Sequence, residues 1–232
     1  MSPNATVAIA PGVDYFPGFL DRAAQEALRD DVLAILKRAP PFRPRMPRTG
    51  KPFSVMMSNC GSLGWVSDEN GYRYAPAHPE TGRPWPPLPE PLTAMWDDVA
   101  GYAHPPEACL INFYGPEAKM GLHQDRDEAD FSAPVVSLSL GDSCLFRIGG
   151  LKRGDPTRSF RLNSGDVVVL GGTARLAFHG VDRIYPETST LFAQAGLTGG
   201  GRINLTMRRV TRPLGPDDAP SREHPAPAAA VD

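Results

Sequence analysis

The sequence has few cysteines, no long apolar run and no basic leader. Its three cysteines, Cys60, Cys109 and Cys144, are odd in number and form no Cys-x-x-Cys pair. This pattern excludes a disulfide framework and indicates reduced thiols in a cytosolic protein. No segment approaches the ~20 consecutive apolar residues that a membrane span needs, and the opening MSPNATVAIAPG lacks the basic start of a signal peptide. We therefore expect a cytoplasmic protein without a membrane partner.

The chain also lacks a strong excess of charge, since its formal net charge is −2. The basic residues are nevertheless unevenly distributed, and the stretch KRAPPFRPRMPRTGK at 37–51 contains six of them and no acidic residue. A second cluster comprises Lys152, Arg153, Arg158 and Arg161. Such clusters can bind phosphates in a chain that is nearly neutral overall. A solvated loop remains the simpler interpretation of either cluster taken alone.

Proline and glycine are abundant, at 26 and 23 residues, and favour many turns and short strands over a helical bundle. Apolar residues at helical spacing predict one helix between an N-cap at Asp21 and the stop at Pro40, and a second from Pro91 to Gly101. After Ala108, short apolar segments between turn residues predict strands. These segments are ACLINFYG, PVVSLSLG, SCLFRIGG, RSFRLN, DVVVLGG, ARLAFHG and GRINLTMRRV.

Many short strands without intervening helices are typical of a sandwich, jelly roll or barrel. We expect one mainly β (α+β) domain over residues 1–212, with N-terminal helices. The Pro-rich residues 213–232 are predicted to form a disordered tail.

Two predicted strands carry polar residues on one face. In GRINLTMRRV, Arg202, Asn204, Thr206 and Arg208 alternate with apolar residues, and in ACLINFYG Asn112 and Tyr114 share a face. A water-exposed face explains either strand alone. If both faces line a barrel interior, the two arginines need an anion, because an unpaired buried charge is costly. A small dicarboxylate would suit them, since guanidinium groups bind carboxylates in a bidentate fashion.

The segment GLHQD places His123 and Asp125 two residues apart, so their side chains project together from an extended chain. A solvated edge is the simplest interpretation of such a pair. His179, next to a glycine turn, is the best partner among the other histidines, whereas His78 lies in a prolyl loop. Two imidazoles and a carboxylate make the facial triad of non-heme Fe(II) oxygenases. Zinc can use the same ligands, but the anion-binding arginines favour iron with 2-oxoglutarate.

Together these motifs resemble the AlkB family of Fe(II)/2-oxoglutarate-dependent nucleic-acid dealkylating dioxygenases, in particular its bacterial members. The resemblance runs from about Pro41 to Arg208. It is carried by NCGSLGWVSDENGYRY, INFYGPEAKMGLHQDRDE, SLSLG, FRIGGLKRGDP, NSGDVVVLGG and the closing R-I-N-L-T-M-R. It implies a double-stranded β-helix (jelly-roll) core at 108–210, and a nucleotide-recognition lid within 41–107.

The resemblance also implies roles for individual residues. The iron ligands are then His123, Asp125 and His179. The residues that hold 2-oxoglutarate are Asn112, Tyr114, Arg202, Asn204 and Arg208, with Arg202 at the far carboxylate and Arg208 near the metal. The residues that meet the substrate are Trp65, Tyr72, Tyr74, Asp127 and Arg153.

The activity implied by the resemblance is oxidative demethylation of bases such as 1-methyladenine and 3-methylcytosine, in single- or double-stranded DNA and in RNA, by a monomer. O₂ and 2-oxoglutarate are consumed, and succinate, CO₂ and formaldehyde are released. Two alternatives remain: a 2-oxoglutarate oxygenase that acts on a protein or small metabolite, and a non-catalytic module that binds damaged nucleic acid. The basic stretch counts against the first, and the intact ligand set counts against the second.

Overall fold

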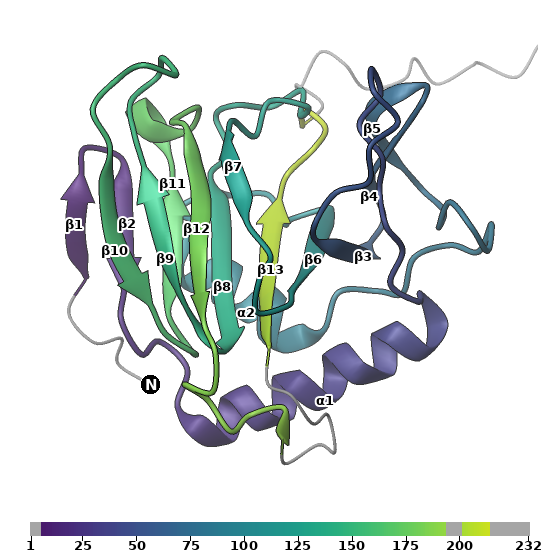
Figure 1. Ribbon diagram of the computed structural model, residues 1–232, viewed down its shortest axis with the longest axis horizontal. Helices are drawn as coiled ribbons and strands as arrows, with labels where there is room; N and C mark the ends of the chain where they lie inside the picture. The colour runs from purple at the N-terminus through teal and green to yellow at the C-terminus, as the bar shows by residue number, and fades with distance from the viewer. Residues whose placement is uncertain (1–5, 194–200, 214–232) are drawn as a thin grey trace, which may run out of the picture.

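The computed structural model describes residues 6–193 and 201–213, and its strands form two facing antiparallel sheets (Figure 1). The predicted mainly β fold is confirmed. Most of the predicted tail lies outside the described residues. The larger sheet has the order β1-β2-β11-β8-β13-β6-β3. Its strands are β1 (Val7–Ala10), β2 (Val13–Phe16), β3 (Met56–Gly61), β6 (Ala108–Tyr114), β8 (Val135–Gly141), β11 (Val167–Leu170) and β13 (Arg202–Arg208).

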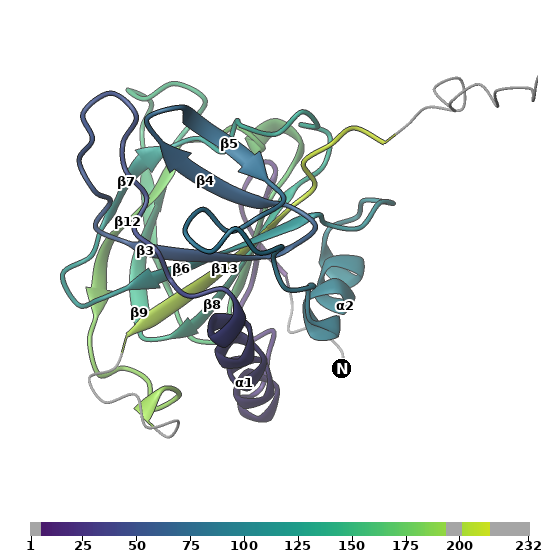
Figure 2. The same ribbon diagram turned by 90° about the vertical axis from the view of Figure 1, so that its right-hand side faces the viewer.

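The smaller sheet has the order β10-β9-β12-β7, and a separate hairpin joins β4 to β5. Figure 2 shows this hairpin on the opposite side of the larger sheet from both helices. The larger sheet takes strands from both sides of residue 107, because β1, β2 and β3 join it from the N-terminal part of the chain. The bounds are β4 (Gly64–Asp68), β5 (Gly71–Ala75), β7 (Met120–His123), β9 (Ser143–Ile148), β10 (Arg158–Leu162) and β12 (His179–Tyr185).

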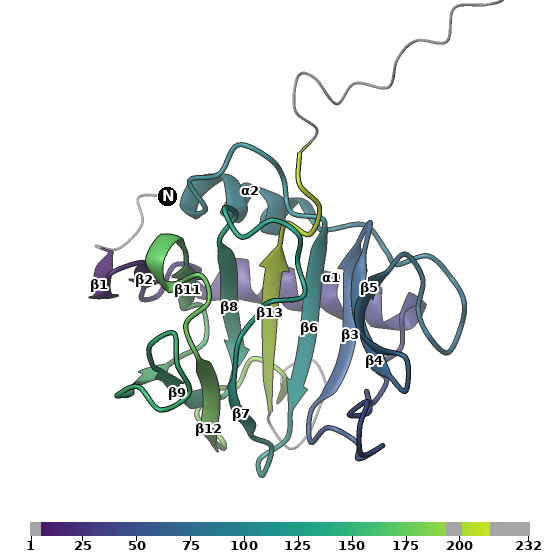
Figure 3. The ribbon, with the colours of Figure 1, turned by 90° about the horizontal axis from the view of Figure 1, so that it is seen from above.

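Helices α1 (Arg22–Arg38) and α2 (Glu90–Val99) cover the outer face of the larger sheet, and Figure 3 shows α1 crossing its strands. The predicted N-cap is confirmed, since the Asp21 carboxylate accepts the backbone N–H of Ala24. Helix α2 begins at Glu90, one residue earlier than predicted, because Pro91 fits the first turn, where its missing N–H costs nothing. None of the helices in the described ranges is long and apolar enough to cross a membrane.

The side chains of β13 point alternately to the two faces of the larger sheet, and each face packs in a different layer. Ile203, Leu205 and Met207 face outward and pack in the apolar cluster that includes the buried residues of α1 and α2. The opposite face of the larger sheet meets the smaller sheet, and a second apolar cluster there includes Val168 of β11 and Phe146 of β9. Burial of both faces explains why all seven residues of β13 are buried.

The predicted strand ARLAFHG is wrong. A 3₁₀ turn covers Gly172–Ala174, and the next residues make turn and loop contacts instead of a ladder. The backbone N–H of Ala177 binds the carbonyl of Ala174, and that of Phe178 binds the carbonyl of Gly150. Apolar alternation alone does not distinguish such a segment from a strand. His179 is therefore the first residue of β12 rather than the last residue of a preceding strand.

The chain passes from the larger sheet to the smaller one at Gly141, which ends β8 with a φ of +86°. A Cβ at this position would lie 2.3 Å from the Gly201 carbonyl oxygen and 2.4 Å from the Phe192 ring. The backbone of Gly141 and its close packing therefore both require glycine.

We predict that Gly141→Ala lowers the free energy of unfolding by more than about 2 kcal/mol, through the left-handed backbone and the steric overlap. Gly115→Ala is the matched control, because no atom of residues 6–193 or 201–213 lies within 4 Å of its added Cβ. It should change stability by less than about 1 kcal/mol in urea unfolding. Equal stability of the two variants would contradict the argument.

Candidate active site

The two sheets enclose a cavity of about 510 Å³. The polar faces of β6 and β13 line this cavity, so the prediction that they point to the barrel interior is confirmed. The histidine and aspartate side chains that close the opposite side come from β7, from the loop after it and from β12. The lining includes Asn112, Tyr114, His123, Asp125, His179, Arg202, Asn204, Thr206 and Arg208.

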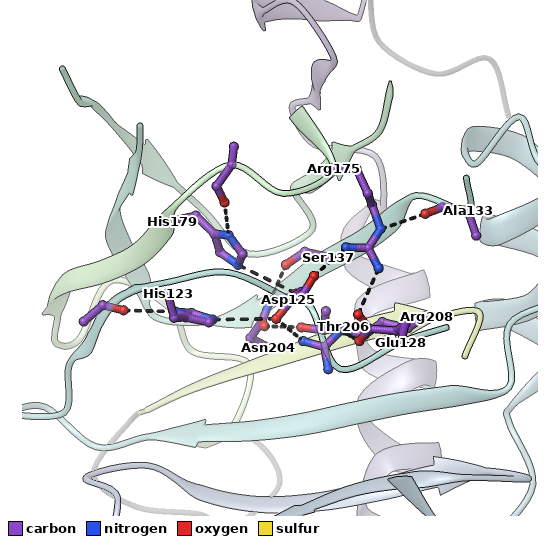
Figure 4. A network of polar contacts seen from close by, with 12 residues as sticks. His123, Asp125, Glu128, Ala133, Ser137, Arg175, His179, Asn204, Thr206 and Arg208 are labelled. Atoms are coloured by element: carbon purple, nitrogen blue, oxygen red, sulfur yellow. Dashed lines mark hydrogen bonds and ion pairs between the residues drawn. The ribbon is translucent and has the colours of Figure 1, made fainter. Parts of the chain in front are cut away.

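His123, Asp125 and His179 come together at one point of the cavity, and one donor atom from each lies within 4.8 Å of the others. The ladder between β7 and β12 places the two histidines directly opposite each other, although they are far apart in the chain. Their Nε2 atoms each lie 3.8 Å from a different oxygen of Asp125 (Figure 4). Among the described residues, this is the one group of three or more such side chains that could hold a metal.

The backbone fixes the orientation of both imidazoles. Nδ1 of His123 lies 2.9 Å from the Gly121 carbonyl oxygen, and Nδ1 of His179 lies 3.0 Å from that of Ala177. A carbonyl can only accept, so each Nδ1 carries the proton and each Nε2 offers a lone pair toward Asp125. Burial, with the nearby His123, lowers the pKa of His179 to about 4, so this ring is neutral at neutral pH.

The third donor is an ionised carboxylate. Burial opposes the charge on Asp125, but Arg208 and the two histidines hold the pKa of the carboxyl well below its ordinary value. Asp125 Oδ1 accepts from Arg208 Nη2 at 2.8 Å, while the buried Oδ2 has no hydrogen-bond partner in the described part of the chain. Two imidazole nitrogens and a carboxylate with a buried oxygen directed to them suit a divalent ion such as Fe(II).

Across the cavity, Arg202 is 2% exposed, and its Nε and Nη1 have no hydrogen-bond partner among the described residues. Its guanidinium lies over the Tyr114 ring, 5.6 Å from the centroid. The buried Asn112 Oδ1 is also without a partner. A buried guanidinium with free N–H groups is costly unless an anion binds there, so this wall fits a carboxylate group of 2-oxoglutarate.

Sequence reasoning missed two buried charges that hold this site, Glu128 and Arg175. Arg175 Nη2 lies 3.1 Å from Glu128 Oε2, and both side chains are almost fully buried. The same guanidinium donates to the carbonyls of Asp125 and Ala133 (Figure 4). Arg175 thereby fixes the loop that carries Asp125. The acidic character of GLHQDRDEAD suggested solvent exposure, and only the fold shows that Glu128 points inward.

Four of the five predicted substrate residues lie along the cavity: Trp65, Tyr72, Asp127 and Arg153. The rings of Trp65 and Tyr72 are stacked, with centroids 5.6 Å apart and an interplanar angle of 18°. Trp65 Nε1 donates to Asp127 Oδ2 at 2.8 Å. Arg153 lies over the Phe178 ring and donates to the Leu122 carbonyl. An aromatic pair, an acid and a guanidinium therefore lie beside the metal-binding point.

Tyr74 is placed differently, because it does not line the cavity and its hydroxyl is directed to Glu128. His78, the competing histidine, is also away from the site. Its ring is buried against Phe42 and Trp85, and both nitrogens engage the backbone, Nε2 with the Pro40 carbonyl and Nδ1 with two N–H groups. His78 is a core histidine.

We predict that His123→Ala, Asp125→Ala and His179→Ala each weaken Mn(II) binding at least about 100-fold, because loss of a ligand exceeds the 10- to 100-fold effect of losing an outer partner. Isothermal titration calorimetry measures the affinity, and circular dichroism verifies the fold. His104→Ala is the control, since this exposed histidine lies outside the cavity. A variant that binds Mn(II) like the unmodified protein would remove its residue from the ligand set.

Comparisons with known proteins agree with this geometry. The family model of the 2OG-Fe(II) oxygenase superfamily matches residues 12–208. The alpha-ketoglutarate-dependent dioxygenase AlkB homolog of Caulobacter vibrioides is 56% identical over 204 residues, which cover 88% of this chain and 90% of that protein. The alpha-ketoglutarate-dependent dioxygenase AlkB of Escherichia coli is 42% identical over 211 residues, which cover 87% and 92%.

A solved structure, that of OsALKBH1, superposes with a TM-score of 0.75 at 32% identity. The match covers 88% of this chain and 100% of the OsALKBH1 chain. Sequence family, relatives and fold thus agree with a site that could hold Fe(II) and 2-oxoglutarate. The chain belongs to the AlkB family of the 2OG-Fe(II) oxygenase superfamily.

Proposed function

We propose that this protein removes alkyl groups oxidatively from N-alkylated bases of DNA and RNA. The observation that carries the proposal is the stacked pair Trp65–Tyr72, with Asp127 bonded to it, beside the point where His123, Asp125 and His179 converge. An oxygenase for a protein or small metabolite has no evident need for a flat aromatic platform next to its metal. A binding module has no need for a metal site.

Different side chains of the cavity would hold the cosubstrate and the metal. Fe(II), with 2-oxoglutarate and O₂, supplies the oxidation of a substrate C–H bond, with succinate and CO₂ as co-products. Arg202 would bind the far carboxylate, with Asn112, Tyr114 and Asn204 around it. Arg208, already in contact with Asp125, would meet the end of 2-oxoglutarate nearer the metal. Oxidation of an N-methyl group gives a hemiaminal, which releases formaldehyde and restores the base.

The aromatic platform and the acid suit a flipped, cationic base. Alkylation at N1 of adenine or N3 of cytosine leaves a positive charge, and aromatic faces attract cations. Asp127 adds an opposite charge at the edge of the platform. The Trp65 N–H holds that carboxylate in place. Because a base that cannot pair costs less to extrude from a helix, the lesion itself assists selection.

The hairpin β4–β5 and the basic residues between 43 and 51 belong to the nucleotide-recognition lid that we propose within 41–107. Two hydrogen bonds join the backbone of Arg45 to the hairpin. Its N–H donates to the Ser67 carbonyl, and its carbonyl accepts from the Ser67 hydroxyl. Arg43, Arg48 and Lys51 are exposed beside it. This arrangement puts positive charge next to the platform, where the phosphates around an extruded base would lie.

We propose that the enzyme is a monomer made of the single predicted domain, residues 1–212. The cysteines are free and buried, which supports a cytoplasmic location.

We predict that Asp127→Asn selectively impairs cationic lesions. The amide oxygen can still accept from Trp65, so the change removes charge with little change of shape. Formaldehyde release from oligonucleotides with 1-methyladenine or 3-methylcytosine should fall about 10- to 150-fold relative to a neutral lesion such as 1-methylguanine, the value of one charge-assisted contact. Equal losses on charged and neutral lesions would refute a charge-reading role for Asp127.

We also predict that the basic residues near the hairpin bind phosphates. Replacing Arg43, Arg45, Arg48 and Lys51 by glutamine should weaken oligonucleotide binding. It should also reduce the dependence of log K on log salt by roughly 0.7–0.9 per lost contact. Fluorescence anisotropy at several salt concentrations measures this slope. Arg183→Gln, an exposed arginine on β12, is the control. A salt slope that stays unchanged in the fourfold variant would show that the segment is only a solvated loop.

A further inference from the structure

The two tyrosines of β5 have different surroundings although they lie on the same face of the hairpin. Tyr72 is 49% exposed and stacks on Trp65. The Tyr74 hydroxyl instead reaches behind the cavity wall, where it donates to Glu128 Oε1 at 2.5 Å and accepts from Arg208 Nη1 at 3.2 Å. Tyr74 therefore connects the hairpin with two charged groups of the core.

Glu128 is a rigid anchor for this connection. Its side chain is 1% exposed, and its carboxylate lies 3.1 Å from the Arg175 guanidinium. The same guanidinium donates to the carbonyls of Asp125 and Ala133. The position of Glu128 is thus tied to the loop of the metal ligand. Burial raises the pKa of the Tyr74 hydroxyl well above its ordinary value, despite the neighbouring Arg208, so the hydroxyl keeps the proton that it donates.

Arg208 is held along two edges. Nη2 donates to Asp125, and Nη1 donates to Tyr74. The remaining donor, Nε, lies 3.5 Å from Glu128 without a hydrogen bond. Because a guanidinium is planar, two contacts at different nitrogens fix both its position and its plane. Without the Tyr74 contact, the guanidinium would keep the ion pair with Asp125 and the longer contact with Glu128, but it would lose the hydrogen bond that holds Nη1.

We propose that Tyr74 is a positioning residue, which orients Arg208 toward 2-oxoglutarate and ties the substrate-facing hairpin to the cosubstrate site. Tyr74 acts through Arg208 and touches neither substrate nor metal. This inference rests on the proposed role of Arg208 at the cosubstrate. It reassigns Tyr74, which the sequence placed among the substrate-binding residues.

The test is Tyr74→Phe, which removes one oxygen and keeps the ring. The dissociation constant of 2-oxoglutarate from the Mn(II)-loaded protein, measured calorimetrically without nucleic acid, should rise about 10-fold, as expected for one hydrogen bond to a charged group. In dealkylation assays KM for 2-oxoglutarate should rise by a similar factor. The value of kcat at saturating 2-oxoglutarate should stay within about threefold, the pattern of lost uniform binding.

The matched control is Tyr15→Phe, because the Tyr15 hydroxyl also donates to a buried carboxylate, Asp166, at 2.7 Å, and neither residue lines the cavity. This variant should lose a comparable amount of stability and bind 2-oxoglutarate like the unmodified protein. Glu128→Gln, which keeps the side-chain volume, should weaken 2-oxoglutarate in the same direction as Tyr74→Phe.

The outcomes separate this inference from the proposed function. Unchanged 2-oxoglutarate binding in Tyr74→Phe, or an equal loss in Tyr15→Phe, would overturn the positioning role. If Tyr74→Phe weakens 2-oxoglutarate while the unmodified protein dealkylates no oligonucleotide, the positioning role stands and the proposed function fails.

Discussion

The ion pair between Arg208 and Asp125 is the contact on which the rest of the site depends. Both side chains are 7% exposed and their atoms approach to 2.8 Å. A carboxylate at that depth without a counter-ion would cost several kcal/mol and would tend to take up a proton. With Arg208 beside it, Asp125 stays ionised and can serve as a metal ligand. The same guanidinium then contributes positive charge to the cavity where an anionic cosubstrate would bind.

Further buried charges surround the pair of Arg208 and Asp125. Glu128 and Arg175 add one charge of each sign, so the buried cluster is electrically balanced before a metal or cosubstrate binds. Arg202 lies outside this balance, with two donor nitrogens that have no hydrogen-bond partner among the described residues. The cavity therefore has one electrically balanced side, which holds the three candidate metal ligands, and one side with excess positive charge. A divalent metal fits the first side, and a dicarboxylate spans both.

Much of the site could be predicted from the period of two along its strands. The polar face of β13 is such a pattern, because alternate side chains of a strand share a direction. The short spacing of His123 and Asp125 also identified that pair, although β7 ends at His123 and Asp125 lies in the loop after it. The anion requirement followed from two arginines on one face. These inferences needed no knowledge of which strands pair, because a strand side chain has only two directions to choose from.

The remainder could not be predicted because it depends on contacts between distant segments. Glu128 is acidic and lies in an acidic stretch, yet Arg175 neutralises it from a turn that was itself predicted as a strand. Tyr72 and Tyr74 are two residues apart on β5 and share a face of the hairpin. Only the fold shows that the Tyr74 hydroxyl is buried against Arg208. The sequence nevertheless identified His179 as the best candidate for the second histidine of the triad. Its place opposite His123, at the start of β12, is shown only by the ladder with β7.

The central claim is that one cavity binds a metal, 2-oxoglutarate and an alkylated base together. The most direct measurement is the stoichiometry of products from an oligonucleotide that contains 1-methyladenine, with Fe(II), O₂ and 2-oxoglutarate present. We expect one succinate and one formaldehyde for each adenine restored, with no turnover when either Fe(II) or 2-oxoglutarate is omitted. Succinate formation without formaldehyde or restored adenine, at the same rate with and without the oligonucleotide, would contradict it.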